Sequence, residues 1–291
     1  MSDRINVGYI GLGNIGKPSA EKIIGEHFNV HVYDLDTAAV AALVEQGAQG
    51  CSSVAELAKA CIHIGICVRD DEQVEALLYG EGGIFANAGP GTLIAVHSTV
   101  TQASLLRWTQ EAQQQDIILI DAPITGGAHR AEAGTLCYMV GADESLLPRV
   151  SPIFSTSAEK IVHAGAVGAG IALKLCNNYI QYAEFVAMAE ATRLAEACGL
   201  SVDVLRDVGL SNGVVNEQMH MFVNGRNSLV KTCTAQEMDQ FFGAMGRLGR
   251  KDLECVLATA EDKGVVMPTA QFISERIERV FVATDESRPV E

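Results

Sequence analysis

The sequence predicts two domains: an α/β domain with a mostly parallel, doubly wound sheet, then an all-helical domain, with a long helix joining the two. Up to residue 163, short apolar runs alternate with amphipathic segments, which is typical of parallel strands connected by helices. From residue 164 onward, the apolar residues recur with helical spacing and no strand-like run remains. The predicted domains are therefore 1–163 and 164–291, and an apolar content of 48 % is sufficient for packed cores.

The same periodicity predicts the individual elements. The predicted strands are 5–10, 29–34, 62–68, 92–96, 117–121, 136–141 and 160–163. In the first domain, a helix follows the first strand, and further helices are predicted at 37–46, 53–60, 71–79 and 101–114. In the second domain, the predicted helices are 168–198, 201–209, 213–223, 234–262 and 268–283. Pro268 suits the first turn of the last helix.

A glycine-rich turn follows the first predicted strand. It consists of Gly11, Leu12, Gly13, Asn14, Ile15 and Gly16. Between a strand and a helix, this G-x-G-x-x-G pattern indicates a Rossmann-type dinucleotide site rather than a chance glycine turn. Gly11 makes the turn, Gly13 lets the backbone approach a pyrophosphate, and Gly16 lets helix and strand pack closely. The helix N-terminus then faces the phosphates.

An acidic residue ends the second predicted strand. Asp34 lies about 20 residues beyond the glycines, where a carboxylate accepts hydrogen bonds from the ribose hydroxyls and repels a 2′-phosphate. Leu35 and Asp36 supply no cation, so the sequence favours NAD, with NADP possible. Asp34 could also cap the helix that begins near Thr37.

Lys174 is flanked by small and apolar residues in the segment GAVGAGIALKLCNNYI. At helical spacing, Lys174, Asn178 and Gln181 lie on one face. Burying an amine or an amide without a partner is costly, so this stripe is a candidate for chemistry. Equally compatible is a lysine whose stem packs and whose ammonium reaches water.

Three other segments carry polar groups. Ser98 and Thr99 follow the strand 92–96, where their hydroxyls would border a nicotinamide, although such residues often only cap helices. The segment 121–127, DAPITGG, ends in adjacent glycines whose N–H groups could bind a carboxylate, or it is simply a turn. The segment 250–252, Arg-Lys-Asp, is typical of a solvated helix face or of helical ion pairs.

Composition excludes several function classes. A net charge of −15 argues against nucleic acid or an anionic membrane as partner, but not against a small carboxylate substrate. No apolar run is long enough to cross a bilayer. The eight cysteines are scattered, without metal-ligand spacing, so no metal is expected. With a first strand that starts near residue 5, leaving no room for a signal peptide, we expect a cytoplasmic protein.

Four ordered motifs resemble the β-hydroxyacid dehydrogenase family, which includes 3-hydroxyisobutyrate dehydrogenase and tartronate semialdehyde reductase. The first is the glycine turn, in the segment 8–16. The second is 121–127 together with Gly134-Thr-Leu136 and Met139-Val-Gly141. The third runs from Gly168 to Asn178, and the fourth is Lys251-Asp-Leu253. The resemblance extends over essentially the whole chain.

The resemblance implies an NAD-dependent oxidoreductase that acts on a small 3-hydroxy acid or its semialdehyde. Lys174 would be the catalytic acid or base, and Asn178 would orient the substrate. The substrate would bind at Ser98, Thr125, Gly126 and Gly127, with its carboxylate at the last three. Thr99 would lie beside the nicotinamide, Val68 and Gln73 along the cofactor, and Lys251 would reach the bound dinucleotide. We also expect a homodimer or homotetramer, because exposed apolar helices favour association.

Two positions depart from the family pattern. Thr125 stands where the family usually has serine, so the hydroxyl is kept and a methyl narrows the pocket. Arg130 stands where glycine or alanine is common. Arg130 either meets a second anionic group of a dicarboxylic substrate or is an ordinary surface arginine.

Two other activities remain open. One is imine reduction on the same scaffold, although those relatives generally lack the lysine kept here. The other is a non-catalytic dinucleotide sensor, which loss of Lys174 would have favoured.

Overall fold

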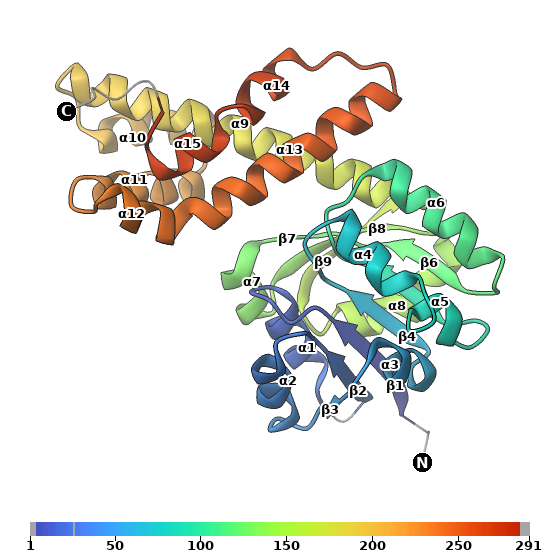
Figure 1. The fold of residues 1–291 in the computed structure, drawn as a ribbon. Coiled ribbons are helices and arrows are strands. Elements are labelled where there is room, and N and C mark those ends of the chain that lie inside the picture. Colours follow the sequence, from blue (N-terminus) through green and yellow to red (C-terminus); the bar gives the residue numbers. More distant parts are fainter. Residues whose placement is uncertain (1–3, 26, 286–291) are drawn as a thin grey trace. The chain divides into compact units, whose positions relative to one another are not determined.

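The computed structural model describes residues 4–25 and 27–285. The chain divides into two compact units, Met1–Lys174 and Leu175–Glu291. Among the described residues, every strand belongs to the first unit, and the second unit is built from helices, as the ribbon in Figure 1 shows. The predicted fold class is confirmed.

The strands of the first unit form one sheet in the order β3-β2-β1-β4-β5-β6-β8-β7, with β9 paired to β8. The strands are β1 (Ile5–Ile10), β2 (Phe28–Tyr33), β3 (Gln49–Gly50), β4 (His63–Ile66), β5 (Leu93–Val96), β6 (Ile118–Asp121), β7 (Ile124–Thr125), β8 (Leu136–Gly141) and β9 (Ala158–Gly165). The pairs from β3 to β6 are parallel, whereas β8 runs antiparallel to β6 and β7. The carboxyl ends of β1, β4, β5 and β6 therefore share one edge of the sheet.

Helices cover both faces of this sheet. They are α1 (Gly16–Ile23), α2 (Thr37–Val44), α3 (Val54–Ala60), α4 (Asp71–Leu78), α5 (Ile84–Asn87), α6 (Gln102–Gln113), α7 (Gly127–Ala133), the 3₁₀ turn η1 (Glu144–Leu146) and α8 (Leu147–Phe154). Val7 and Tyr9 of β1 pack in one core cluster with side chains of α1, α2, α7 and α8. Gly8 has the opposite orientation in the strand and faces Leu57 of α3.

Several short elements were not predicted. Strands β3 and β7 have two residues each, too few for an alternation to be visible. Helix α8 has a proline in its first turn and a second one, Pro152, inside it. Because proline usually interrupts a helix, the sequence does not predict one here. Helix α7 begins in the glycine pair of the segment 121–127, for which the sequence indicates either a carboxylate-binding loop or a turn but no helix.

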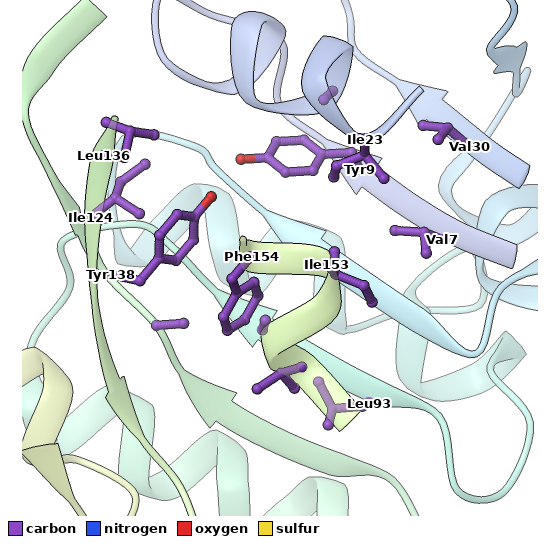
Figure 2. Packing of buried hydrophobic residues seen from close by; sticks show 14 of the residues in the cluster. Val7, Tyr9, Ile23, Val30, Leu93, Ile124, Leu136, Tyr138, Ile153 and Phe154 are labelled. Atoms are coloured by element: carbon purple, nitrogen blue, oxygen red, sulfur yellow. The ribbon is translucent and has the colours of Figure 1, made fainter. Parts of the chain in front are cut away.

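The core of the first unit contains an aromatic cluster (Figure 2). Tyr138 and Phe154 stack with ring centroids 4.8 Å apart. His97 stacks on Tyr9 at 5.7 Å and meets Phe154 edge-on at 5.5 Å. His63 also meets Phe154 edge-on. Two imidazole rings are thus buried among aromatic side chains.

Both histidines should make stability depend on pH. Burial lowers the pKa of His63 to about 3 and that of His97 to about 4. Since an unfolded histidine titrates near 6.5, the stability of the neutral, buried rings is present above that pH and is lost as the pH falls. Between pH 7 and 5, each ring should remove about 2 kcal/mol from the free energy of unfolding.

Urea denaturation of the wild type and of His63→Phe checks this expectation. From pH 7 to pH 5, the variant should lose about 2 kcal/mol less than the wild type, because it has one buried imidazole fewer. An equal loss in both proteins would show that His63 does not titrate in this way.

The second unit has its own core, built from helices. Helix α9 (Ala169–Ala197) crosses from the first unit into the second, and α10 (Val202–Asn212), α11 (Glu217–Val230), α12 (Ala235–Met238), α13 (Ala244–Asp262), α14 (Pro268–Ser274) and α15 (Ile277–Val282) follow. Phe185 of α9 stacks on Phe281 of α15 at 4.4 Å. The helix predicted at 234–262 is interrupted by a π-helical turn, η2 (Asp239–Gly243).

Candidate active site

The glycine turn joins β1 to α1 with close backbone contacts. Gly11 has a φ of 92°, and a Cβ there would lie 2.3 Å from the carbonyl oxygen of Cys67. A Cβ at Gly16 would lie 1.9 Å from the carbonyl oxygen of Gly11. Gly13 and Asn14 are exposed, and a Cβ at Gly13 would meet nothing within 4 Å. Two glycines therefore close the turn, and Gly13 leaves its outer side open.

This turn fits a dinucleotide diphosphate. Helix α1 has no acidic residue in its first turn, and no side chain caps the N–H groups there. At the positive end of the helix dipole, beside the open side of Gly13, backbone N–H groups can therefore bind an anion. The residues present suit NAD or NADP.

Asp34, directly after β2, is tied to the glycine turn. Its Oδ2 accepts a hydrogen bond from Leu12 N at 2.5 Å, and its Oδ1 accepts one from Asp36 N at 2.7 Å. The cap of α2 is Asp36, which accepts from Ala38 N and Ala39 N, so the capping role considered for Asp34 is wrong. Asp34 is instead held beside the turn, where it keeps free lone pairs for a ribose.

The ends of β4 and β5 bring together further predicted residues. Ser98 Oγ accepts a hydrogen bond from Val68 N at 2.9 Å, and Ser98 is only 4 % exposed. Gln73, in the first turn of α4, accepts from Arg69 N at 3.0 Å through Oε1. Thr99 follows Ser98 and is half-buried. Val68, Ser98 and Thr99 therefore lie at the same edge of the sheet as the glycine turn.

A buried carboxylate anchors the start of α9 to the end of β6. Asp121, 1 % exposed, accepts hydrogen bonds from Gly168 N and Ile171 N, each at 2.7 Å. Burial raises the pKa of Asp121 to about 6, although the backbone N–H groups favour the charged form. A Cβ at Gly170 would lie 2.3 Å from the carbonyl oxygen of Met139, so helix and strand are in direct contact. Lys174 lies one turn beyond this anchor and is 9 % exposed.

The segment 121–127 continues from β6 into α7. Thr125 is half-buried, and Gly126 and Gly127 are exposed with φ values of 133° and 69°. A Cβ at Gly126 would lie 2.8 Å from Cβ of Arg130. The Arg130 side chain is 40 % exposed, and its Nη1 lies 3.7 Å from Oε2 of Glu159. Arg130 thus borders the glycine pair while taking part in a surface ion pair.

In the second unit, Asn178 belongs to a buried polar cluster that was not predicted. Asp252 of α13 accepts hydrogen bonds through Oδ2 from Asn178 Nδ2 at 2.8 Å and from Tyr182 OH at 3.0 Å. Lys251 Nζ lies 2.7 Å from the other oxygen, Oδ1. Gln181 is exposed, so Tyr182 replaces it on the buried face of the polar stripe.

Sequence reasoning missed Asp252 because it stands in a charged segment. Arg250 does form the surface pairs expected there, at 3.0 Å to Glu254 and 3.3 Å to Glu278. Asp252 is only 3 % exposed. The available signal was the apolar Leu253-Glu-Cys-Val-Leu pattern, whose helical phase turns position 252 inward.

The predicted site residues are divided between the units. The glycine turn, Asp34, Val68, Gln73, Ser98, Thr99, Thr125, Gly126, Gly127, Arg130 and Lys174 belong to the first unit, and Asn178 and Lys251 to the second. Lys174 and Asn178 are one turn apart on α9. Within residues 4–25 and 27–285, no three His, Cys, Asp or Glu side chains gather as a metal site. In the same part of the chain, no helix combines the length and apolarity that a membrane crossing requires.

Comparison with known protein families gives two matches that together cover most of the chain. Residues 6–165 match the family model of the NAD binding domain of 6-phosphogluconate dehydrogenase. Residues 168–287 match a model described as NAD-binding of NADP-dependent 3-hydroxyisobutyrate dehydrogenase.

Individual relatives align over nearly their full length. The chain is 33 % identical to 2-(hydroxymethyl)glutarate dehydrogenase of Eubacterium barkeri, over 90 % of this chain and 96 % of the relative. It is 31 % identical to 3-hydroxyisobutyrate dehydrogenase of Pseudomonas aeruginosa, over 88 % and 85 %. The structure of a Mycobacterium tuberculosis 3-hydroxyisobutyrate dehydrogenase with L-serine superposes with a TM-score of 0.83 at 27 % identity, covering 97 % of this chain and 98 % of that one. The chain therefore belongs to the β-hydroxyacid dehydrogenase family and is an oxidoreductase that uses NAD or NADP.

Proposed function

We propose that the protein transfers a hydride between NAD and a small 3-hydroxy acid or its semialdehyde, with Lys174 exchanging a proton with the substrate oxygen. The observation that carries this proposal is the buried Lys174, one helical turn beyond the contact between α9 and Asp121. Asp121 ends β6, at the sheet edge where β1 runs into the glycine turn. An amine held at this edge suits proton transfer at a bound alcohol.

Each predicted residue has a distinct role in this proposal. Bound NAD would supply the hydride acceptor. As the carbinol carbon loses its hydride, the neutral Lys174 amine takes the hydroxyl proton, and in the reverse direction the ammonium returns it. The N–H groups of Gly126 and Gly127, with the Thr125 hydroxyl, bind the substrate carboxylate. Asn178 orients the substrate, and Lys251 contacts the dinucleotide.

A spectrophotometric panel tests the proposal. Hydroxy acids of the 2-, 3- and 4-hydroxy classes are supplied with NAD or with NADP, and formation of reduced nicotinamide is followed. We expect turnover with 3-hydroxy acids and NAD. Binding of NAD without turnover of any hydroxy acid would favour the sensor, and reduction of cyclic imines alone would favour imine reduction.

Arg130 bears on the substrate class. The relative named for 2-(hydroxymethyl)glutarate acts, by its name, on a dicarboxylate, and Arg130 borders the proposed carboxylate site. If Arg130 binds a second carboxylate, Arg130→Ala should lower kcat/KM about tenfold for dicarboxylic hydroxy acids only, because a partly exposed charged contact contributes roughly 1.4 kcal/mol. Glu159→Gln, which removes only the ion pair, is the matched control. Unchanged kcat/KM for both substrate types in Arg130→Ala would leave Arg130 as a surface residue.

We further propose a cytoplasmic homo-oligomer, a dimer or tetramer. Leu200, Val204 and Val208 are each more than half exposed in and just before α10, and they recur at helical spacing. Such a stripe favours burial against another copy. Within residues 4–25 and 27–285, no two cysteines form a disulfide, which suits a reducing compartment.

A further inference from the structure

Asp252 is a buried carboxylate with an unusual set of partners. Its Oδ2 accepts two hydrogen bonds, from Asn178 and Tyr182, both on α9. Lys251 Nζ lies near Oδ1, without the alignment of a hydrogen bond. Burial and the neighbouring carboxylate raise the pKa of Tyr182, so its phenol stays protonated and donates. Burying a charge is costly, and apolar residues of similar size often stabilise a core better. The network therefore requires an explanation beyond packing.

The backbone of α13 is shaped to bring this carboxylate to α9. Gly249 lies one turn before Asp252, and a Cβ there would be 3.0 Å from Cε1 of Tyr182. The tyrosine ring thus packs over a glycine, and its hydroxyl reaches Asp252. The close approach of these two helices fixes where Asp252 meets Asn178.

The contact with Asp252 determines which way round the Asn178 amide lies. A carboxylate has only acceptors, so Asn178 must turn its N–H₂ group toward Asp252. The amide oxygen is then directed away from Asp252. Without such a partner, either orientation of an asparagine amide is possible.

We propose that Asp252 is a positioning residue: it fixes the Asn178 amide so that Asn178 presents its oxygen, an acceptor, to the helix face that it shares with Lys174. That oxygen accepts an N–H of Lys174, one turn away on α9, and turns the amine's lone pair toward the substrate hydroxyl. The inference rests on the proposed function of Lys174. It adds Asp252 as the residue that determines the orientation of the Asn178 amide oxygen and nitrogen.

Exchanging donor and acceptor tests this inference. In Asn178→Asp, two carboxylates face each other, and kcat should fall at least a hundredfold. In the double variant Asn178→Asp/Asp252→Asn, the amide at 252 donates to the carboxylate at 178, which still offers an oxygen to Lys174. The double variant should therefore recover kcat at least tenfold over Asn178→Asp.

Asp252→Leu tests the positioning role separately. It replaces the carboxylate with an apolar group of the same branched shape, and kcat measured at saturating NAD and substrate should fall about ten- to hundredfold. The matched control is Glu254→Leu, which removes an exposed carboxylate two residues further along α13 and should keep the wild-type kcat. Wild-type kcat in Asp252→Leu, or a double variant no better than Asn178→Asp, would overturn the proposal.

The chemical denaturation midpoints of the same proteins need no substrate. Asn178→Asp should lower the midpoint, and the double variant should restore it. If the wild type oxidises no hydroxy acid, the proposed function fails. The midpoints still test whether the amide of Asn178 donates its hydrogen bond to Asp252. A double variant that unfolds as early as Asn178→Asp would refute the exchange of donor and acceptor whatever the activity.

Discussion

Replacing Lys174 with alanine is expected to lower kcat for hydroxy-acid oxidation by a factor of about 10² to 10⁴, the usual contribution of a positioned acid or base. Lys174 is buried and lies one turn beyond the Asp121 anchor, so its truncation removes the proposed acid or base from this position. The dissociation constant of NAD should stay nearly the same, because Lys174 acts on the substrate. Stopped-flow turnover and NAD titration measure the two quantities.

The control for Lys174→Ala is Lys160→Ala, which removes an exposed lysine from β9 of the same unit. That variant should keep the wild-type kcat. Near-normal turnover in Lys174→Ala, with the fold intact, would remove the lysine from the mechanism.

Asp34→Arg should reverse the cofactor preference. The ratio of kcat/KM with NAD to that with NADP should fall by a factor on the order of 10², because a like charge beside the 2′-phosphate is replaced by a cation. Asp34 also binds Leu12 N and Asp36 N, so Asp34→Asn, which keeps an acceptor, separates charge from structure. This neutral variant should show a smaller shift in the same direction.

Asp36, two positions after Asp34, is the matched control for Asp34. Asp36 caps α2, and Asp36→Asn should alter stability slightly while leaving cofactor selectivity unchanged. If Asp34→Arg showed the wild-type selectivity, the carboxylate would have no part in reading the ribose.

The sequence predicted elements whose period extends over several turns or strand residues. In the structure, the first strand begins at residue 5 and helix α14 begins at Pro268, as the sequence predicts. The helix predicted at 168–198 spans Ala169–Ala197. The antiparallel insertion of β8 between β6 and β7 was not predictable, because pairing direction leaves no mark on a six-residue apolar run.

In the candidate site, too, the sequence predicts some residues and not others. The glycine turn and Asp34 were predictable because each position has its own backbone or charge requirement. Asp252 and Tyr182 were not, because their role depends on which residues of α9 and α13 meet, and two helices far apart in sequence carry no local signal of that contact. The sequence places Asp121 in a motif, whereas its role as the anchor of α9 is visible only in its hydrogen bonds to Gly168 and Ile171.

The position of one nitrogen atom, Nζ of Lys174, decides whether the lysine acts on the substrate. A crystal structure of the protein with NAD and a slowly oxidised 3-hydroxy acid measures the distance from Lys174 Nζ to the substrate hydroxyl oxygen. We expect hydrogen-bond contact, about 2.6–3.2 Å, with the substrate carboxylate at Gly126 and Gly127. A ternary complex in which Nζ points to solvent, and another group contacts the hydroxyl, would contradict the account.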